Sequence, residues 1–548
     1  MKRLCLDTIV TGKSAMLFCN SKRRCEVCAG AIAQAISKHI HHVATSSTTP
    51  SSSNHYHLKP EVRAGRLALI ESLSQTQVGI CPVLRETLPA GVAYHHAGLT
   101  LDERKIVEDG FRAGLVQVLC TTSTLSAGVN MPAHRVIIRS PRMGDKFLNV
   151  SGFRQMCGRA GRMGLDAKGE AILMIMAGNK SEKNIADHLM TADLDPLSSS
   201  LHIGAGGGLE KLLLEMISCG RLQNEGEVMR FISCTLMSIQ QEKTDVLNYT
   251  RDALVFLKKE QFVQGLSDGQ LSPSPLGIAT TVSGIAPKDA VQVLKPLMDA
   301  RCKIILKGGL HPVFLVTPPS TPIEPDWKNY EKVLHVLYQE HPDAEAVATY
   351  LGIERGQLCT YAFQNPPRIG ASPKAQLYRR FFSAILLFTL VQEWPITRVT
   401  RLITHVTRGQ LQQLQKDAAV FCGMTVIFCR KLNWPMLASC LEDFSARLNY
   451  GVHKDILALV RLGPEITAAR ARALLKNGIE SALDILHAGV EVVTEIVLDS
   501  LPYDGRDPLQ AHETTSNITT TTTATTTTTN TTRSGTTDSS RMGGLAQR

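Results

Sequence analysis

The fold is decided by three segments: HHAGL at residues 95–99, TTSTLSAGVNMPA at residues 121–133 and QMCGRAGRMG at residues 155–164. The second segment follows Val116–Leu119, an apolar run that is typical of a buried strand. Its hydroxyls and backbone N–H groups are therefore expected at the end of a strand. In open α/β sheets that end is where ligands bind. The three segments together predict an α/β lobe with a ligand site.

The third segment carries two arginines at helical spacing. In a helix, Gln155, Arg159 and Arg162 would share one face, because they stand at i, i+4 and i+7. Gly158 and Gly161 would let another backbone or a phosphate come close. Two guanidiniums at this spacing suit the charge that develops on a transferring phosphoryl group. The alternative is a surface helix with solvated arginines.

Another apolar strand is expected at Val136–Ile138, and with it the order of segments resembles motifs IVa, V and VI of the superfamily 2 nucleic-acid helicases. The amino-acid sequence of these segments is most similar to the helicase domain of DNA polymerase theta, the helicase Q-like proteins and the archaeal repair helicases. The resemblance implies two RecA-like lobes that hold ATP and Mg²⁺ between them. It also implies three groups of residues: Arg159, Arg162 and Gln155 as catalytic; Gly128, Asn130 and Gly158 as nucleotide-binding; His96, Gly98 and Thr122 as nucleic-acid-binding.

Composition agrees with a reduced, nucleic-acid-binding protein. The 548 residues carry a net charge of +10, which favours a polyanionic partner. Fourteen cysteines are scattered without the spacing of a disulfide framework, which indicates reduced thiols in cytosol or nucleus. The N-terminus is too polar for a signal peptide, and the longest apolar run, Phe381–Val391, is too short to span a membrane. For a relative of repair helicases, a nuclear location is expected.

The N-terminal residues read as the start of a second RecA-like lobe. Thr11–Ser14 lacks the glycine five positions before Gly12 that a P-loop needs, and a strand pattern at Ala15–Cys19 follows where the P-loop has a helix. Cys25 and Cys28 with the histidines at 39–42 could suggest zinc, but we expect this cysteine pair on a helix and the histidines at the start of a loop. Residues 44–57 are rich in serine, threonine and histidine and predict a disordered insertion.

Five domains follow from these patterns and the resemblance, in a mostly helical chain after the α/β lobe. They are a second RecA-like lobe at 1–182, a winged helix at 183–283, a helical ratchet domain at 284–455, a helix-hairpin-helix at 456–504 and a disordered Thr-rich tail at 505–548. Helices at 209–217 and 228–236 and then 252–259, with a hairpin-like stretch to about 283, favour the winged helix. A plain helical linker is the alternative there. Apolar stripes predict long helices at 378–391, 411–429 and 437–448.

A row of cations ends the predicted ratchet domain. Arg447, Lys454 and Arg461 recur every seven residues, and on one continuous helix they could follow a phosphate backbone. A solvated charged face is the alternative. The resemblance implies a helix that contacts single-stranded DNA in this region. Trp434 could stack on a base, although a buried tryptophan is the commoner case. Residues 462–486 predict two helices, with Gly478 ending the first.

No P-loop motif and no acidic pair after a buried strand is found in the sequence. We therefore expect the C-terminal part of an ATP-dependent DNA helicase that acts in repair on single-stranded or forked DNA. Its first lobe would be supplied in cis or in trans, and the chain alone would be inactive as an ATPase. Two other functions stay open. One is a single-stranded DNA-binding protein without motor activity, and the other is an RNA helicase relative.

Overall fold

The N-terminal lobe of the computed structural model is built on one parallel sheet with the strand order β2-β3-β1-β4-β7. The strands are β1 (Ala15–Phe18), β2 (Val92–His95), β3 (Val118–Thr121), β4 (Arg135–Ile138) and β7 (Glu170–Leu173). The structure describes residues 1–46, 59–76, 78–125, 131–144, 146–161, 168–201, 208–265, 269–320, 323–364, 367, 372–463 and 465–499. The predicted α/β lobe with a parallel sheet is confirmed, although the third strand lies two residues further on than expected.

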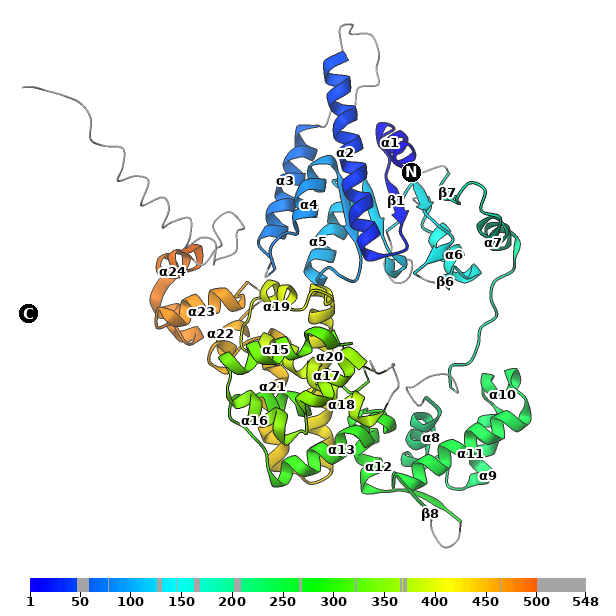
Figure 1. Ribbon diagram of the computed structural model, residues 1–548, viewed down its shortest axis with the longest axis vertical. Coiled ribbons are helices and arrows are strands. Elements are labelled where there is room, and N and C mark those ends of the chain that lie inside the picture. The colour runs from blue at the N-terminus through cyan, green and yellow to red at the C-terminus, as the bar shows by residue number, and fades with distance from the viewer. Residues whose placement is uncertain are drawn as a thin grey trace, which may run out of the picture.

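The sheet is the centre of the lobe because its strands are apolar on both faces. All residues of β1, β2 and β3 are buried, as is usual for parallel strands that are covered by helices on both sides. Helix α2 packs against β2 and β3, α5 against β2, and α6 against β4 (Figure 1). The bounds in this lobe are α1 (Lys2–Val10), α2 (Lys22–Ser46), α3 (Pro60–Ser74), α4 (Pro82–Thr87), η1 (Leu88–Ala90), α5 (Leu101–Arg112), η2 (Ser123–Leu125), β5 (Arg142–Met143), β6 (Lys146–Phe147), α6 (Val150–Cys157) and α7 (Lys180–Thr191).

Helix α2 carries both the cysteine pair and the histidines of the zinc alternative. Cys25 and Cys28 are buried on this helix, as expected. The histidines at 39–42 are on the same helix, so the expected loop there is wrong, and so is disorder at 44–46. Among the described residues, no group of three or more His, Cys, Asp or Glu side chains is placed to hold a metal ion. The rest of the predicted insertion and the Thr-rich tail lie outside the described residues.

A helix-turn-helix region with a small hairpin follows the lobe. Its elements are α8 (Gly208–Ser218), α9 (Glu225–Ser233), α10 (Leu236–Gln240), α11 (Lys243–Lys259), the antiparallel strands β8 (Val263–Gly265) and β9 (Leu271–Pro273), and α12 (Pro275–Ser283). The expected helices and a hairpin are present, and the winged helix itself stays a prediction. The expected extension of the hairpin-like stretch to about residue 283 is wrong. Residues 275–283 form a helix that packs against α20 and α8.

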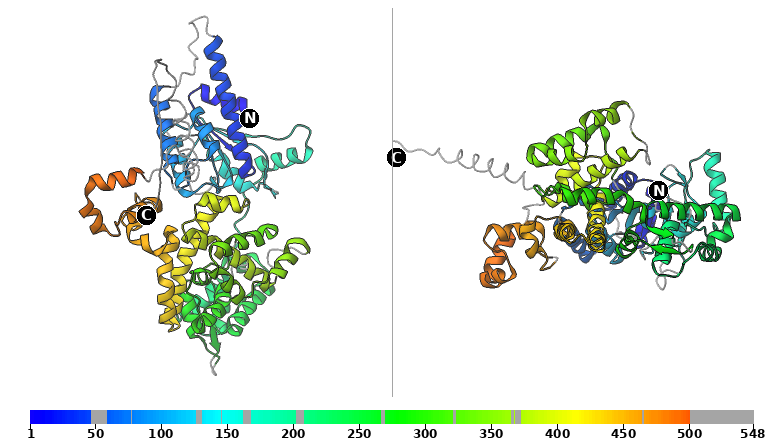
Figure 2. Two further views of the ribbon diagram at one scale, coloured as in Figure 1. Left: turned by 60° about the vertical axis from the view of Figure 1, so that its left-hand side comes forward. Right: turned by 90° about the horizontal axis from the view of Figure 1, so that it is seen from below.

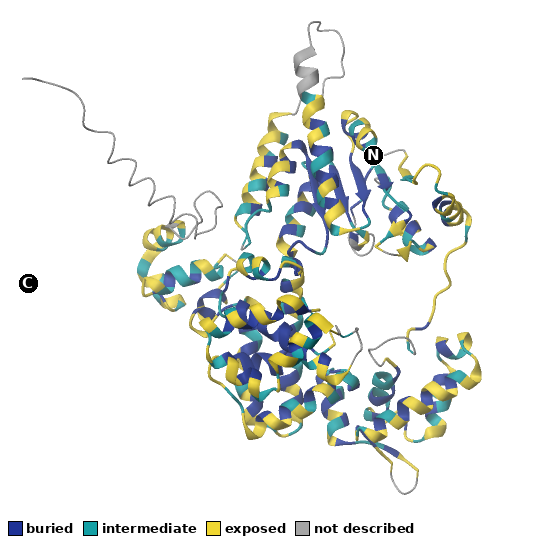
Figure 3. Cartoon of the chain, viewed as in Figure 1, coloured by how far each residue is buried: buried dark blue, intermediate teal, exposed yellow. Residues whose placement is uncertain are grey.

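The next part of the chain is helical, as predicted. Its elements are α13 (Pro287–Cys302), α14 (Leu310–Leu315), α15 (Trp327–Glu340), α16 (Asp343–Tyr350), α17 (Arg355–Cys359), η3 (Thr360–Gln364), α18 (Pro373–Val391), α19 (Ile396–Leu402), α20 (Arg408–Lys431) and α21 (Pro435–Tyr450). One hydrophobic core joins this helical domain to the helix-turn-helix region, and it runs from Leu209 to Leu448. Figure 3 shows the buried faces of these helices turned toward one another. The predicted boundary near 283 therefore crosses a shared core.

The C-terminal helices have a core of their own. They are η4 (Lys454–Ile456), α22 (Leu457–Val460), α23 (Ala468–Lys476) and α24 (Ala482–Asp499), and their buried side chains run from Val452 to Ile479. Figure 2 shows these helices, in orange, at the side of the helical domain. Gly478 has a positive φ of 77° directly after the cap of α23, as predicted.

Within the described residues, two polar contacts tie the helical domain to the lobe and to the C-terminal helices. We call the first the lobe joint, formed by residues 97–103 and 407–412. Gly409 donates its backbone N–H to the carbonyl of Gly98 at 3.1 Å, and Gln412 Oε1 accepts from the backbone N–H of Leu101 at 2.7 Å. Arg408 reaches the fully buried carboxylate of Glu103 at 3.1 Å. The lobe is thus held on the first turn of α20.

The second contact is the C-terminal clamp, in which Arg472 of α23 binds two carboxylates. Its guanidinium lies 2.5 Å from Glu393, just after α18, and 2.6 Å from Asp455. Glu393 also accepts the backbone N–H of His453 at 2.9 Å. The clamp fixes the C-terminal helices to the end of α18 through charged side chains, of which Arg472 is 30 % and Asp455 41 % exposed.

Candidate nucleotide and nucleic-acid interface

The predicted nucleic-acid residues of the lobe gather at the carboxyl edge of the sheet. His95 at the end of β2 is paired in register with Thr121 at the end of β3. Thr122 follows, and its backbone N–H donates to the carbonyl of His95 at 3.4 Å. Thr121 is buried and donates its hydroxyl to the carbonyl of Thr122 at 3.0 Å. Strand pairing therefore brings His96 and Thr122 to the same end of the sheet.

The two histidines are held inside the lobe. His95 Nε2 lies 2.9 Å from Glu108 of α5, and burial lowers the pKa of His95 although this carboxylate opposes the shift. His96 Nδ1 accepts the backbone N–H of Gly98 at 3.0 Å, so its other nitrogen carries the hydrogen and donates to Glu26 at 3.2 Å. Both ring nitrogens of His96 are thus used within the protein.

Gly98 is enclosed by the lobe joint. Its N–H donates to His96 and its carbonyl accepts from Gly409. A Cβ atom at Gly98 would lie 2.9 Å from the His96 ring. The close packing explains why glycine stands here. Both backbone polar groups of Gly98 already have partners within the protein. The predicted contact of Gly98 with a nucleic-acid backbone stays a prediction.

The third segment is only partly helical, which corrects the expected single face. Helix α6 begins at Val150 after the capping side chain of Asn149, and it ends at Cys157 with Gly158 as the C-terminal cap. Arg159 follows in a turn and is half-buried, while Gln155 on the helix and Gly158 are exposed. The helix stops because Ala133 replaces its hydrogen bonds: Ala133 N–H donates to the carbonyl of Arg159 at 2.9 Å, and Gly161 N–H donates to Ala133 at 2.7 Å.

The sheet separates Arg159 from Thr122. Ala133 lies two residues before β4, so its bonds place Arg159 near the amino ends of the strands. Thr122 lies just beyond the carboxyl end of β3. A strand of four residues spans about 13 Å, at about 3.3 Å per residue. Arg159 and Thr122 therefore lie at opposite ends of the strands. Arg162, Gly128 and Asn130 lie outside the described residues.

The predicted row of cations is not a continuous helix. Helix α21 ends at Tyr450, and Gly451 follows in the left-handed conformation with φ 65°. Arg447 is buried in the last turn, Lys454 forms an ion pair with Asp443 at 2.6 Å, and Arg461 is exposed after α22. The seven-residue spacing thus gives three different environments instead of one basic stripe. Trp434 is half-buried, with the guanidinium of Arg301 4.7 Å from its ring.

Sequence analysis missed the residues of the lobe joint, although a signal was present. Thr100 and Glu103 form a capping box on α5, and Thr407 and Gln410 form another on α20. Both follow the pattern Ser/Thr-x-x-Glu/Gln that marks the start of a helix. The pattern predicts two helix ends, but no sequence signal predicts that these ends meet.

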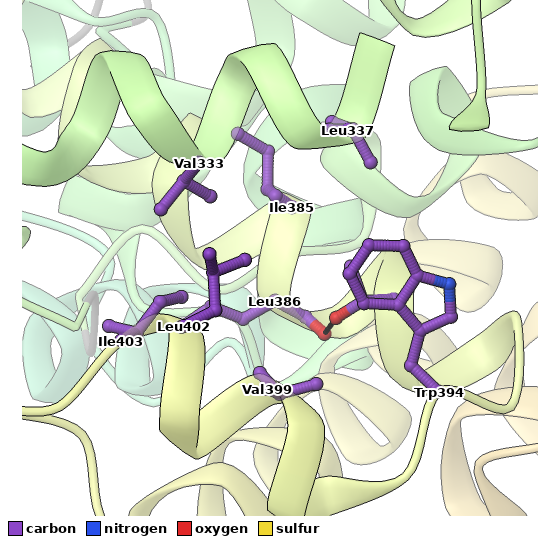
Figure 4. Close-up of a pocket in the computed structure, with 9 residues that line it drawn as sticks. Val333, Leu337, Ile385, Leu386, Trp394, Val399, Leu402 and Ile403 are labelled. Carbon is purple, nitrogen blue, oxygen red and sulfur yellow. Dashed lines mark hydrogen bonds between the residues drawn. The ribbon is translucent and has the colours of Figure 1, made fainter. Parts of the chain in front are cut away.

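The helical domain also contains a small internal cavity, which is not a ligand site. It has a volume of about 10 Å³ and is lined mainly by apolar side chains of α15, α18 and α19 (Figure 4). Its polar side chain, Thr389, donates to the carbonyl of Leu386 at 2.8 Å. A cavity this small holds at most one water molecule.

No helix within the described part of the chain is long and apolar enough to cross a membrane.

Three family models match consecutive parts of the chain. The helicase conserved C-terminal domain matches residues 54–164, a helix-turn-helix domain matches 169–264, and the helical domain of the DNA polymerase theta helicase-like region matches 287–448. The chain therefore carries the C-terminal domain of a helicase, followed by a helix-turn-helix domain and the helical domain of one particular helicase group.

That group is identified by the relatives. The chain is 34 % identical over 520 residues to DNA polymerase theta of Drosophila melanogaster, covering 91 % of this chain and 24 % of the relative. It is 28 % identical over 506 residues to human Helicase POLQ-like (89 % and 43 %), and 26 % identical over 503 residues to the ATP-dependent DNA helicase Hel308 of Pyrococcus horikoshii (90 % and 63 %). Over most of its length the chain is a homologue of the polymerase theta, POLQ-like and Hel308 helicases. It spans about a quarter of the length of the Drosophila relative.

Proposed function

We propose that the chain supplies the second RecA-like lobe and the DNA-holding domains of an ATP-dependent DNA helicase that acts in repair. The observation that carries the proposal is the order of the three matched domains along one chain. A helicase C-terminal domain alone would leave the substrate open. The polymerase theta helical domain after it, and relatives that are named DNA helicases or a DNA polymerase, favour DNA over RNA.

On this proposal, the lobe completes an ATP site that a P-loop lobe provides. Arg159 and Arg162 stabilise the charge on the transferring γ-phosphoryl group, and Gln155 positions them. Gly158 is exposed next to Arg159 in the chain. Gly128 and Asn130 are assigned to the nucleotide side in the same proposal. Mg²⁺ is held by the acidic pair of the P-loop lobe. Because a P-loop motif is not found in the 548 residues, we propose that this chain by itself does not turn over ATP.

Single-stranded DNA passes the carboxyl edge of the sheet in this proposal. Thr122 reaches it directly, and His96 and Gly98 shape the loop beside it. Arg447, Lys454 and Arg461 add positive charge where the helical domain ends, so binding should weaken with salt. The lobe joint ties this edge to α20, so that a movement of the lobe on ATP binding is carried to the helical domain. A nuclear location and a P-loop lobe in cis or in trans belong to the same proposal.

The experiment begins with the 5′ end of the transcript and the size of the native protein. In the native protein, Arg159→Ala is expected to lower ATP turnover at least about 10³-fold while single-stranded DNA affinity changes less than about twofold. Arg154→Ala is the matched control, because Arg154 is an exposed arginine on α6 that donates to the carbonyl of Met190. Loss of DNA binding with turnover retained in Arg159→Ala would contradict the assignment.

One outcome of this mapping would favour a second function, which is DNA binding without a motor. A transcript that starts at Met1 and a native protein of 59.8 kDa would leave Arg159 without a nucleotide site in cis. Salt-dependent binding of single-stranded DNA without ATP hydrolysis would then identify a binding protein. ATP turnover that only RNA stimulates would instead identify an RNA helicase relative.

A further inference from the structure

The C-terminal helix α24 leaves many of its apolar side chains open to solvent. Leu483, Leu486, Val490 and Leu498 are 65 %, 75 %, 83 % and 59 % exposed. A surface helix normally turns one apolar stripe toward the core and polar side chains outward. Figure 3 shows α24 in yellow and teal, and no residue of it with a described burial is fully buried. We call these four side chains, together with the half-exposed Val492, the α24 surface.

A different set of side chains joins α24 to its own module. Ile485, Ala488, Val493 and Ile496 are partly buried against the core of the C-terminal helices, and α24 packs on α23. Gly489 has a non-helical φ of 79° and divides α24 into two arms, with two of these four side chains on each arm. The α24 surface is therefore additional to the apolar side chains that hold this module together, and clustered exposed apolar side chains mark an interaction site.

The same segment is acidic, although the whole chain has a net charge of +10. Residues 465–499 carry six acidic and three basic side chains, and none of the basic ones lies on α24. Glu491 and Glu495 are exposed, and neither forms an ion pair with another described residue. With Leu498 they stand at i, i+4 and i+7 on the second arm, so the three side chains lie on one helix face. Exposed carboxylates and exposed apolar side chains thus occur on the same face.

The three cations of this segment lie on α23 and have other contacts. Arg472 is the centre of the C-terminal clamp, and Arg470 donates to the carbonyl of Glu465 at 2.6 Å. Lys476 is exposed at the end of α23, and in the described part of the chain it pairs with no carboxylate. The carboxylates of Glu491 and Glu495 therefore remain open to the cations of a partner.

The charge of this surface decides which partner fits it. A DNA strand or an anionic lipid surface would bring more negative charge to the exposed carboxylates. A second copy related by a two-fold axis would place the acidic surface against itself. Like charges that face each other at an interface oppose association. The partner that fits has apolar side chains flanked by lysine or arginine.

We propose that the α24 surface binds a basic amphipathic helix of another protein. Such a helix covers the exposed leucines and valines with an apolar stripe at i, i+3, i+4 and i+7. Cations beside the stripe pair with Glu491 and Glu495 at the rim of the contact, where they add specificity and speed of association. The proposal does not rest on the proposed helicase function, because it uses neither nucleotide nor DNA.

The probe is a synthetic helical peptide of leucine and lysine, with its leucines at i, i+3, i+4 and i+7. A labelled peptide is titrated with the full chain, and fluorescence anisotropy gives its affinity at physiological salt. The control peptide has glutamate in place of every lysine. The wild-type chain should bind the lysine peptide at least about tenfold more tightly than the glutamate peptide, because only the lysine peptide complements the carboxylates.

Variants of exposed side chains locate the binding site without disturbing the fold. Leu486→Gln and Val490→Gln should each lower the affinity for the lysine peptide about tenfold, as expected for central apolar contacts. Ile239→Gln is the matched control, because Ile239 of α10 is 80 % exposed in another domain. The control should bind as the wild type does. The double variant Glu491→Gln, Glu495→Gln should bind less tightly and with a smaller dependence on salt.

Other occupants are tested with the same variants. The proposal is overturned if the wild type does not bind the lysine peptide, if it binds both peptides equally, or if Leu486→Gln and Val490→Gln leave the affinity unchanged. Light scattering should show no dimer that Leu486→Gln dissociates, since such a dimer would assign the surface to a second copy. Binding to anionic vesicles and to single-stranded DNA should be the same for Leu486→Gln and the wild type. A loss in either measurement would assign the surface to lipid or DNA instead.

Discussion

The helical domain contacts the N-terminal lobe and the C-terminal helices in two different ways. In the lobe joint, backbone meets backbone at Gly98 and Gly409, and the central carboxylate of Glu103 is fully buried. In the C-terminal clamp, Arg472 joins two carboxylates that are partly open to solvent. Close packing fixes one geometry, whereas exposed ion pairs weaken with salt and acid. We infer that the lobe and α20 move as one body and that the C-terminal helices are the part that can be released.

The largest expected effect is on the buried carboxylate of the joint. Glu103→Ala removes the partner of the buried Thr100 N–H and leaves Arg408 without its counter-ion. We expect a loss of about 4 kcal/mol in the free energy of unfolding of the lobe, because one partner of a buried pair is removed. Urea unfolding measures it. The double variant with Arg408→Met should recover part of the loss, and full additivity of the two losses would contradict the contact.

A smaller loss is expected at the glycine of the joint. In Gly409→Ala, the new Cβ would lie 2.4 Å from the carbonyl oxygen of Ala97 and 2.5 Å from that of Leu99. Backbone atoms on both sides must shift, so we expect a loss of about 2 kcal/mol. Gly423→Ala on the same helix is the matched control, because its Cβ meets nothing within 4 Å. The control should gain up to about 1 kcal/mol from helix propensity. Equal effects at both glycines would refute the tight joint.

The strands and the long helices were predictable because the spacing of their apolar residues along the chain indicates which side chains are buried. The β1 and β4 segments are apolar on both faces, and α18 and α20 repeat apolar residues at helical spacing. The strand expected before Thr122 also placed this residue just beyond the end of a strand. Local patterns therefore gave the type and sequence of most elements.

Tertiary contacts decide the parts that the sequence did not predict. Gly158 ends α6 because Ala133, from another part of the chain, takes the following hydrogen bonds. Gly451 interrupts the row of cations, and a glycine inside a helical pattern is only a weak stop signal. The joint links residues about three hundred positions apart, and no periodicity encodes such a distance. The same applies to the clamp, in which Arg472 meets Glu393.

The clamp should be weaker than the joint. Arg472→Met removes both ion pairs, but the partners are partly exposed, so we expect a loss of about 1 kcal/mol. Salt dependence distinguishes the two contacts. The loss of stability caused by Arg472→Met should shrink in high salt, whereas the loss caused by Gly409→Ala should not. Hydrogen exchange of residues 457–499 reports the clamp separately from the lobe. A loss that is independent of salt would indicate that Arg472 acts through packing.

The smallest effect is the response of the clamp to acid. The hydrogen bonds from Arg472 hold the pKa of Asp455 below its usual value of 3.8. A carboxyl with a lowered pKa in the folded state stabilises the fold above its usual pKa, and this contribution is lost as the pH falls through the lowered pKa. Protection of residues 457–499 from hydrogen exchange should therefore decrease below about pH 4 in the wild type. Arg472→Met should show a smaller step, because His453 is then the charged partner that Asp455 keeps. If the variant and the wild type lose protection in parallel, acid acts elsewhere, and the clamp is not the releasable contact.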